Sequence, residues 1–233
     1  VTQVGSSSYA LDALEFVFTG RAAHAASSPE KGINALDGAI FLFNGINALR
    51  EHLPDDVRIH GIISEGGVAP NVVPERAAAR FYFRSARRRI LDEILVKVKR
   101  IAQGAAMMSG TEVTWHNFEP SNDNLVTNRS LAAAFTGNLQ ALGVTDIIAS
   151  ADGKGSTDMG NVSHVAPAIH PYISLGIDGL VGHTPEFAAA CASPNGRATM
   201  LLAAKALAMT AIDFLCNPSL QQRVREEFQG WTR

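Results

Sequence analysis

In the first part of the chain, apolar residues occupy every second position in some stretches and recur every three or four positions in longer ones. Apolar residues alternate along Leu14–Phe18 until Gly20, which is typical of a strand. Apolar residues then recur at three- and four-residue spacing over Ile33–Leu53, and Pro54 ends that run. The second pattern predicts an amphipathic helix, because these positions share one helix face.

The pattern continues with two strands, a helix and a fourth strand. Apolar residues alternate with other residues in Val57–Ile63 and in Ala79–Phe83, which lie on either side of a Gly-Gly break. They recur at helical spacing in Leu91–Ile101, and Val113–Phe118 is rich in residues that favour strands. The order strand, helix, strand, strand, helix, strand is that of the ferredoxin-like split βαβ fold. We therefore expect an antiparallel sheet with both helices on one face.

A run of turn formers, Pro120–Asn124, marks a domain boundary, so residues 12–120 are expected to close as one domain. Residues 121–233 contain helical patterns and only one or two strands, too few elements to cover their apolar faces. This second segment is therefore expected to be part of a larger α/β domain. Residues 1–11, with Gly-Ser-Ser-Ser at 5–8, are expected to be a linker.

Composition restricts the classes of partner. Hydrophobic residues make up 46% of the 233 positions, and 20 Lys plus Arg stand against 22 Asp plus Glu. This balance argues against nucleic acid or an anionic membrane as partner. We find no apolar run of the length of a membrane span. Two cysteines are too few for a disulfide framework, which favours a reducing compartment, the cytoplasm.

Three features of the first domain carry possible chemistry: His24 after the first strand, Asn71 within the Gly-Gly-Val-Ala-Pro-Asn-Val-Val-Pro segment, and Arg84 at a strand end. Each alone is explained by an ordinary role, as a surface histidine, a turn residue or an exposed cation. The functional alternative is that all three converge on one anionic ligand. Arg84 would then hold a carboxylate through paired hydrogen bonds.

The second segment has two polar loops, Gly155–Ser163 and Gly182–Phe187. His183, with Glu186 or Asp158, is a candidate zinc ligand, since zinc accepts imidazole and carboxylate groups. A catalytic zinc needs about three protein ligands, and the sequence has no further metal-binding motif. No serine has the setting of a nucleophile.

Taken in order, four segments resemble the zinc metallopeptidase and amidohydrolase family of aminoacylase and carboxypeptidase G. They are Gly20–Ala25, Pro29–Asp37, Gly66–Pro74 and Gly155–Ser163. The resemblance covers almost the whole chain and is strongest to the branch formed by the B-type subunit of aminobenzoyl-glutamate hydrolase. It implies that residues 12–120 form a lid domain that mediates homodimerisation, and that 121–233 form the C-terminal part of a catalytic domain.

The resemblance also implies roles for single residues. His24 is expected to reach the partner subunit's site and stabilise an oxyanion, while Asn71 and Arg84 hold the substrate carboxylate. His183 matches the last metal ligand of a two-zinc site, in which manganese or cobalt is an alternative. The other ligands of that site have no counterpart in this chain. The chain alone is therefore expected to bind zinc poorly and to be inactive.

These inferences lead to a metal-dependent amidohydrolase or peptidase that cleaves an N-acyl or peptide bond to an amino acid, such as aminobenzoyl-glutamate or a dipeptide. A non-catalytic dimerisation or ligand-binding module is the alternative. RNA binding is a third hypothesis, because RNA recognition motifs share the split βαβ order. The near-neutral charge counts against it.

Overall fold

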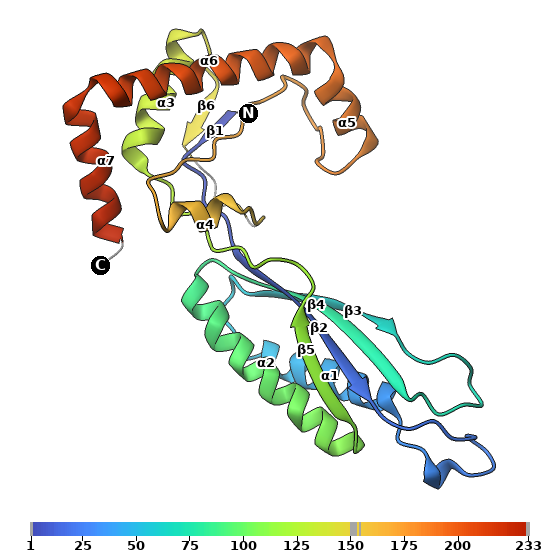
Figure 1. Cartoon of the computed structure of the whole chain (residues 1–233). Helices are drawn as coiled ribbons and strands as arrows, with labels where there is room; N and C mark the ends of the chain where they lie inside the picture. Colours follow the sequence, from blue (N-terminus) through green and yellow to red (C-terminus); the bar gives the residue numbers. More distant parts are fainter. Residues whose placement is uncertain (1, 150–152, 154, 232–233) are drawn as a thin grey trace. The chain divides into compact units, whose positions relative to one another are not determined.

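The computed structural model describes residues 2–149, 153 and 155–231 (Figure 1). The chain divides into two compact units. The first, called here the sheet unit, comprises Tyr9–Asn124. The second, called the helical unit, contains the residues before Tyr9 and those after Asn124.

The sheet unit has the predicted order of elements. Its strands and helices are β2 (Ala10–Thr19), α1 (Ala35–Arg50), β3 (Arg58–Glu65), β4 (Arg76–Ser85), α2 (Arg88–Ser109) and β5 (Glu112–Asn117), with a short 3-10 helix at Pro29–Lys31. The four strands lie in the order β3-β4-β2-β5, and every neighbouring pair is antiparallel. The split βαβ fold class expected from the sequence is confirmed.

The core of the sheet unit lies between the sheet and its two helices, which cover the same face (Figure 1). Phe16 and Phe18 of β2 and Phe81 and Phe83 of β4 are completely or almost completely buried. The rings of Phe16 and Phe81 meet edge to face, 6.2 Å apart and at 78°. Because burying one such ring contributes about 1.5–3 kcal/mol, these alternating aromatics are a major source of stability.

Capping explains where the first helix begins. The apolar spacing starts at Ile33, but α1 starts at Ala35, because the Asn34 side chain accepts a hydrogen bond from the Leu36 N–H at 3.0 Å. Ile33 instead exchanges backbone hydrogen bonds with Arg21.

A polar cluster ties together the two ends of the sheet unit. Asp12, at the start of β2, is 5% exposed and forms an ion pair with Arg88 at the start of α2. Its carboxylate also accepts hydrogen bonds from Ser121 and Asn117. The segments that enter and leave the unit are thus joined to α2 through one buried carboxylate.

The helical unit contains a short parallel pair of strands and five helices within the part of the chain that is described. They are β1 (Thr2–Val4), α3 (Arg129–Ala141), β6 (Ile147–Ala149), α4 (Met159–Ser163), α5 (Pro185–Ala192), α6 (Pro194–Cys216) and α7 (Pro218–Trp231). Residues 1–11, expected as a linker, thus include strand β1 and the first residues of β2. The reason is that Val4 is buried in the small core of this unit.

The helix α6 departs from the expectation that no segment is long and apolar enough to span a membrane. By length and composition alone it meets that condition, as core helices of soluble proteins also do. Its apolar residues include several Ala and Met beside Leu and Ile, interrupted by Lys205 and Thr210 rather than forming one continuous run. Only 11% of its most apolar window is buried.

Candidate functional site

Two loops at one end of the sheet unit are joined by backbone hydrogen bonds. The loop after β2 pairs with the loop before β4, since the Val73 N–H donates to Ala23 O and the Ala25 N–H donates to Asn71 O, both at 3.0 Å. Close approach requires a glycine at residue 20, because a Cβ there would lie 2.1 Å from Ile33 O. The Gly-Arg-Ala-Ala-His-Ala motif therefore has a structural reason for its first residue.

His24 lies in this paired region, as the bridge partner of Val72, and its side chain is exposed. Its Nδ1 accepts hydrogen bonds from the N–H groups of Ala26 and Ser27, at 3.3 and 3.2 Å. In a neutral imidazole one nitrogen accepts and the other carries the proton. The backbone therefore selects the tautomer with the proton on Nε2, which leaves Nε2–H to donate to a ligand.

Asn71 lies beside His24, because its backbone oxygen accepts from the residue that follows His24. Its side chain is exposed as well. The structure therefore brings together two of the three polar residues that the sequence singled out in this domain.

Arg84 lies at the opposite end of β4. Asn71 precedes the first residue of β4, Arg76, and Arg84 is eight residues further along the same strand. At ~3.3 Å per residue this separates Arg84 from the start of β4 by about 26 Å. The expected convergence of His24, Asn71 and Arg84 on one ligand does not occur within a single chain, because an extended strand holds them apart.

The surroundings of Arg84 are cationic and aromatic. Its guanidinium carbon lies 5.7 Å from the centre of the Tyr82 ring, and Arg58 is its direct partner on β3. The pKa of His60 is lowered from 6.5, first by burial and then by the charges of Arg84 and Arg50. This end of the sheet is thus suited to an anionic group.

His183 precedes helix α5 and is exposed. Its φ of 63° places it in the left-handed region, where no other non-glycine residue of the described chain lies. The next residue, Thr184, caps α5, since its hydroxyl oxygen accepts from the Phe187 N–H at 3.2 Å and donates to Val181 O at 2.8 Å. This cap holds His183 in an unusual conformation of the kind that is concentrated at functional sites.

A complete metal site does not fit onto the residues that the structure describes. Among them, no group of three or more His, Cys, Asp or Glu side chains is placed to hold an ion. Asp158, named with His183 as a possible ligand, lies just before α4.

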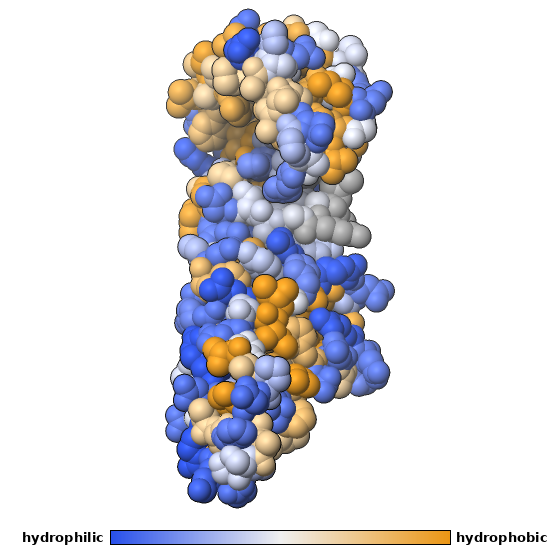
Figure 2. All heavy atoms as spheres, turned by 90° about the vertical axis from the view of Figure 1, so that its right-hand side faces the viewer, coloured by the Kyte–Doolittle hydropathy of each residue, from blue (hydrophilic) through white to orange (hydrophobic). Residues whose placement is uncertain are grey.

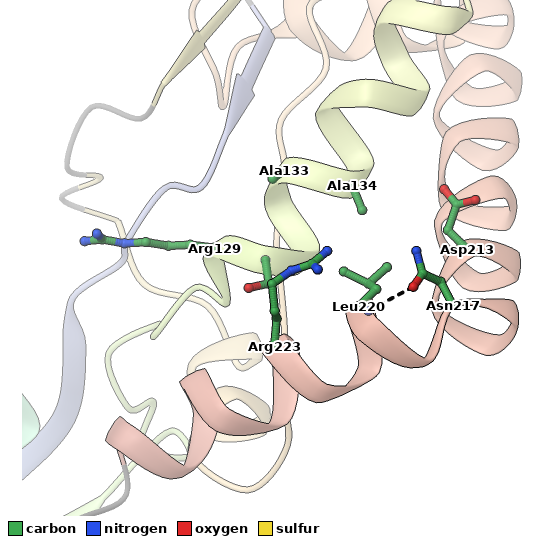
Figure 3. A pocket seen from close by; sticks show the side chains of 8 residues that line it. Arg129, Ala133, Ala134, Asp213, Asn217, Leu220 and Arg223 are labelled. Carbon is green, nitrogen blue, oxygen red and sulfur yellow. Dashed lines mark hydrogen bonds between the residues drawn. The ribbon is translucent and has the colours of Figure 1, made fainter.

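A hollow of about 410 Å³ in the helical unit was not expected from the sequence (Figure 3). It lies among α3, α6 and α7, and its Asp213 and Asn217 have structural partners. Asn217 accepts from the Leu220 N–H, and Asp213 accepts from Asn138. Arg129 extends away from the other labelled side chains (Figure 3). This hollow is explained by helix capping and packing.

The sequence reasoning missed the polar arrangement on the open face of the sheet. There, buried Glu15 accepts a 2.6 Å hydrogen bond from Arg80, and its other carboxylate oxygen lies 3.4 Å from Nε2 of His116. The period-two alternation of Arg80, Tyr82 and Arg84 placed these side chains on one face, but only the cross-strand register brings Glu15 and His116 beside them.

Comparison with known families identifies the domain. Residues 2–107 match the family model described as the peptidase dimerisation domain, M20_dimer. The chain contains an M20 peptidase dimerisation domain. The family resemblance inferred from the four sequence motifs is therefore confirmed, and members of this family are generally metal-dependent.

Two curated relatives extend the match beyond the dimerisation domain. The Xaa-Arg dipeptidase of Mus musculus is 38% identical, over 91% of this chain and 50% of that protein. The B-type subunit of p-aminobenzoyl-glutamate hydrolase from Escherichia coli K12 is 27% identical, over 92% of this chain and 56% of that protein. The chain spans about half the length of these relatives. Identity is higher to the dipeptidase than to the hydrolase branch that the motifs favoured.

A solved structure shares the fold. The aminobenzoyl-glutamate utilization protein from Klebsiella pneumoniae matches with a TM-score of 0.66 at 20% identity, over 93% of this chain and 52% of that one. The dimerisation domain and the helical unit thus both have counterparts in a known fold.

Proposed function

We propose that this chain is part of a metal-dependent amidohydrolase or peptidase that cleaves an N-acyl or peptide bond to an amino acid, with zinc as the metal. The observation that carries the proposal is the hydrogen bonding of the His24 ring. Its Nδ1 is occupied by two backbone N–H groups, so Nε2–H is available as a fixed hydrogen-bond donor. Donors fixed in advance are what an oxyanion in acyl transfer requires.

The substrate carboxylate is assigned to Arg84, whose neighbours Arg58 and Arg50 add positive charge at the same end of the sheet. A guanidinium binds a carboxylate through two parallel hydrogen bonds. The relatives are named as a dipeptidase and as an aminobenzoyl-glutamate hydrolase, and both names denote substrates with an amide bond to an amino acid.

Two copies of the chain are needed to bring these residues to one substrate. Because β4 extends about 26 Å from its start to Arg84, and His24 and Asn71 lie at the end where it starts, we propose that one site combines Arg84 of one subunit with His24 and Asn71 of the other. His183 is assigned as a metal ligand in that proposed assembly. The remaining ligands would come from parts of the protein beyond those described.

The dimer is proposed to form through β3, an outer strand of the sheet. Ile62 and Ile63 on this strand are 62% and 41% exposed, and the face that includes β3 shows hydrophobic side chains among hydrophilic ones (Figure 2). An outer strand offers backbone groups to a second strand, and a two-fold dimer would satisfy both copies at once.

A mixing experiment with the full-length enzyme tests the proposal. His24→Ala should lower kcat by roughly 100-fold or more, as expected for an oxyanion donor, whereas Arg84→Ala should mainly raise KM. Mixing inactive His24→Ala chains with inactive His183→Ala chains should restore part of the activity, because some heterodimers would contain one intact site.

The control is a demonstration of subunit exchange between two differently tagged chains. Exchange without recovery of activity would place His24 in its own subunit's site or outside catalysis. An inactive full-length protein that still dimerises would favour the non-catalytic module.

A further inference from the structure

The sheet face opposite the two helices carries a row of charged and aromatic side chains. The row begins at Glu15, which accepts a hydrogen bond from Nε of Arg80 at 2.6 Å. The Arg80 guanidinium carbon lies 5.3 Å from the centre of the Phe118 ring, and the Phe118 and Tyr82 rings are 5.6 Å apart. The row ends at Arg84, whose guanidinium carbon lies 5.7 Å from the centre of the Tyr82 ring. Arg84 is therefore linked to the middle of the sheet through the Tyr82 ring.

Tyr82 is held in two ways. Its hydroxyl donates a hydrogen bond to a carboxylate oxygen of Glu119, which raises the pKa of Tyr82 and keeps the phenol protonated. Its ring also packs against the Phe118 ring at an inclination of 57°. A hydrogen bond donated to an anion polarises the phenol and makes its ring more attractive to a cation. The held ring is thus a favourable support for the Arg84 guanidinium.

Arg58 and Arg50, which add positive charge near Arg84, are anchored differently. Their guanidinium groups donate to main-chain carbonyl oxygens at 2.7 and 2.9 Å. Arg58 is also the direct partner of Arg84 on the neighbouring strand, and like charges in that position repel each other. The Tyr82 ring offsets this repulsion with an attractive contact on the strand of Arg84 itself.

The contact between Tyr82 and Arg84 is of a kind that prepares a cation for a ligand. The two residues are half-buried and lie two positions apart on β4, so their side chains share one face. Contact with a ring face takes none of the N–H donors of a guanidinium. It restricts the orientations of the long side chain, so less conformational entropy is lost when an anion binds.

We propose that Tyr82 is a positioning residue that orients Arg84 for its anionic ligand, with Phe118 and Glu119 holding the Tyr82 ring in place. The inference rests on the role of Arg84 in the proposed function. Tyr82 acts through the guanidinium of Arg84 and not through the ligand. Its effect must therefore vanish when that guanidinium is removed.

Steady-state kinetics of the full-length enzyme test this dependence. The probe substrates are p-aminobenzoyl-glutamate and alanyl-arginine, because the relatives are named for substrates of these two types. Tyr82→Leu should raise KM about two- to fivefold with kcat nearly unchanged, the fold-change that one solvent-accessible cation–π contact implies. Tyr82→Phe should restore most of the wild-type KM, because the ring remains. The matched control, Tyr172→Leu, changes a 52% exposed tyrosine of the helical unit and should leave KM unchanged.

A double-mutant cycle separates positioning from direct contact with the ligand. In an Arg84→Gln background, Tyr82→Leu should raise KM no further, whereas a residue that touches the ligand would still raise it. A KM that Tyr82→Leu leaves unchanged, or raises equally in both backgrounds, would overturn the positioning role. If Arg84→Gln alone leaves KM unchanged, the proposed function loses Arg84. The two failures appear in different variants and are therefore distinguishable.

A second measurement does not depend on turnover. In the 233-residue chain, the Nε–H resonance of Arg84, assigned with Arg84→Lys, should carry a ring-current shift from Tyr82. Tyr82→Leu should remove this shift, while Tyr82→Phe and Tyr172→Leu should keep it, and circular dichroism verifies the fold of each variant. An Arg84 resonance that Tyr82→Leu does not move would overturn the support by the ring, even for an enzyme that is inactive on both probes.

Discussion

The two compact units of this chain bury their apolar residues to different extents. In the sheet unit, four phenylalanines of β2 and β4 face both helices and are at most 1% exposed. In the helical unit, apolar side chains of α6 such as Leu201, Ile212 and Leu215 are 57%, 59% and 72% exposed. Among the residues that the structure describes in that unit, one cluster of buried apolar side chains comprises Val4, Ala132, Phe135, Leu139 and Ala206.

The difference shows when a stretch of sequence can bury its own apolar residues. Each amphipathic helix of the sheet unit has an apolar sheet face to cover, so local pattern and tertiary packing agree. The helix α6 is apolar on several sides, but α3, α5 and α7 contact only part of it. Stability should therefore respond strongly to substitutions in the sheet unit and weakly to substitutions on the outer side of α6.

The largest effect is expected from Phe81→Ala. Removing this buried ring should lower the free energy of unfolding of the sheet unit by about 3–5 kcal/mol, through lost burial and the cavity that remains. Urea denaturation followed by Trp115 fluorescence, in a Trp231→Phe background, measures this unit alone. The control Phe187→Ala removes a ring that is 38% exposed in the other unit. A loss of unfolding free energy below about 1 kcal/mol would show that Phe81 is not part of a tightly packed core.

A smaller effect is expected from Asp12→Asn, which breaks the ion pair at the ends of the sheet unit. The cost should be about 1.5–3 kcal/mol, because Arg88 would lose a charged partner that is 5% exposed. Asp92→Asn is the matched control, since Asp92 pairs with the same arginine while its side chain is 62% exposed. It should cost less than about 0.5 kcal/mol. Equal losses of stability for Asp12→Asn and Asp92→Asn in the same denaturation assay would contradict the expected difference between the buried and the exposed partner of Arg88.

For the helical unit, Leu215→Lys should change the free energy of unfolding by no more than about 0.5 kcal/mol. It should also reduce self-association, since it places a charge on an exposed apolar surface. Sedimentation velocity at several concentrations measures the association. Leu139→Ala, at a fully buried site of the same unit, should destabilise by about 2–5 kcal/mol. Strong destabilisation by Leu215→Lys would mean that α6 is already covered.

The smallest effect concerns the titration of His60. Burial, and then the charges of Arg84 and Arg50, keep its pKa below 6.5 in the folded protein. Folding therefore favours the neutral form, so stability from this group is present above pH 6.5 and is lost as the pH falls through the folded pKa. Arg84→Gln should raise the pKa of His60, which an NMR titration detects. A pKa unchanged by that substitution would contradict the proximity of Arg84.

The elements of the sheet unit could be predicted from the sequence because each has one buried and one exposed face. For example, the alternation of Leu14, Phe16 and Phe18 along the chain directly indicates which side chains of this strand face the core. The start of α1 differed by two residues, because the Asn34 cap overrides apolar spacing. In the helical unit, the sequence predicts a linker where strand β1 lies, since the three residues of β1 have no pattern long enough to predict pairing with β6.

The sequence by itself determined the order of the elements, the family and the individual residues that carry chemistry. His24, Asn71, Arg84 and His183 each lie next to a turn or strand end that motif and composition reveal. Only the tertiary structure decided which of them meet. His24 and Asn71 are joined by the pairing of two loops, whereas the extended strand β4 holds Arg84 away from them. The arrangement of Arg80, Glu15 and His116 on the open face depends on the register of β4, β2 and β5, a long-range property that alternation along one strand does not contain.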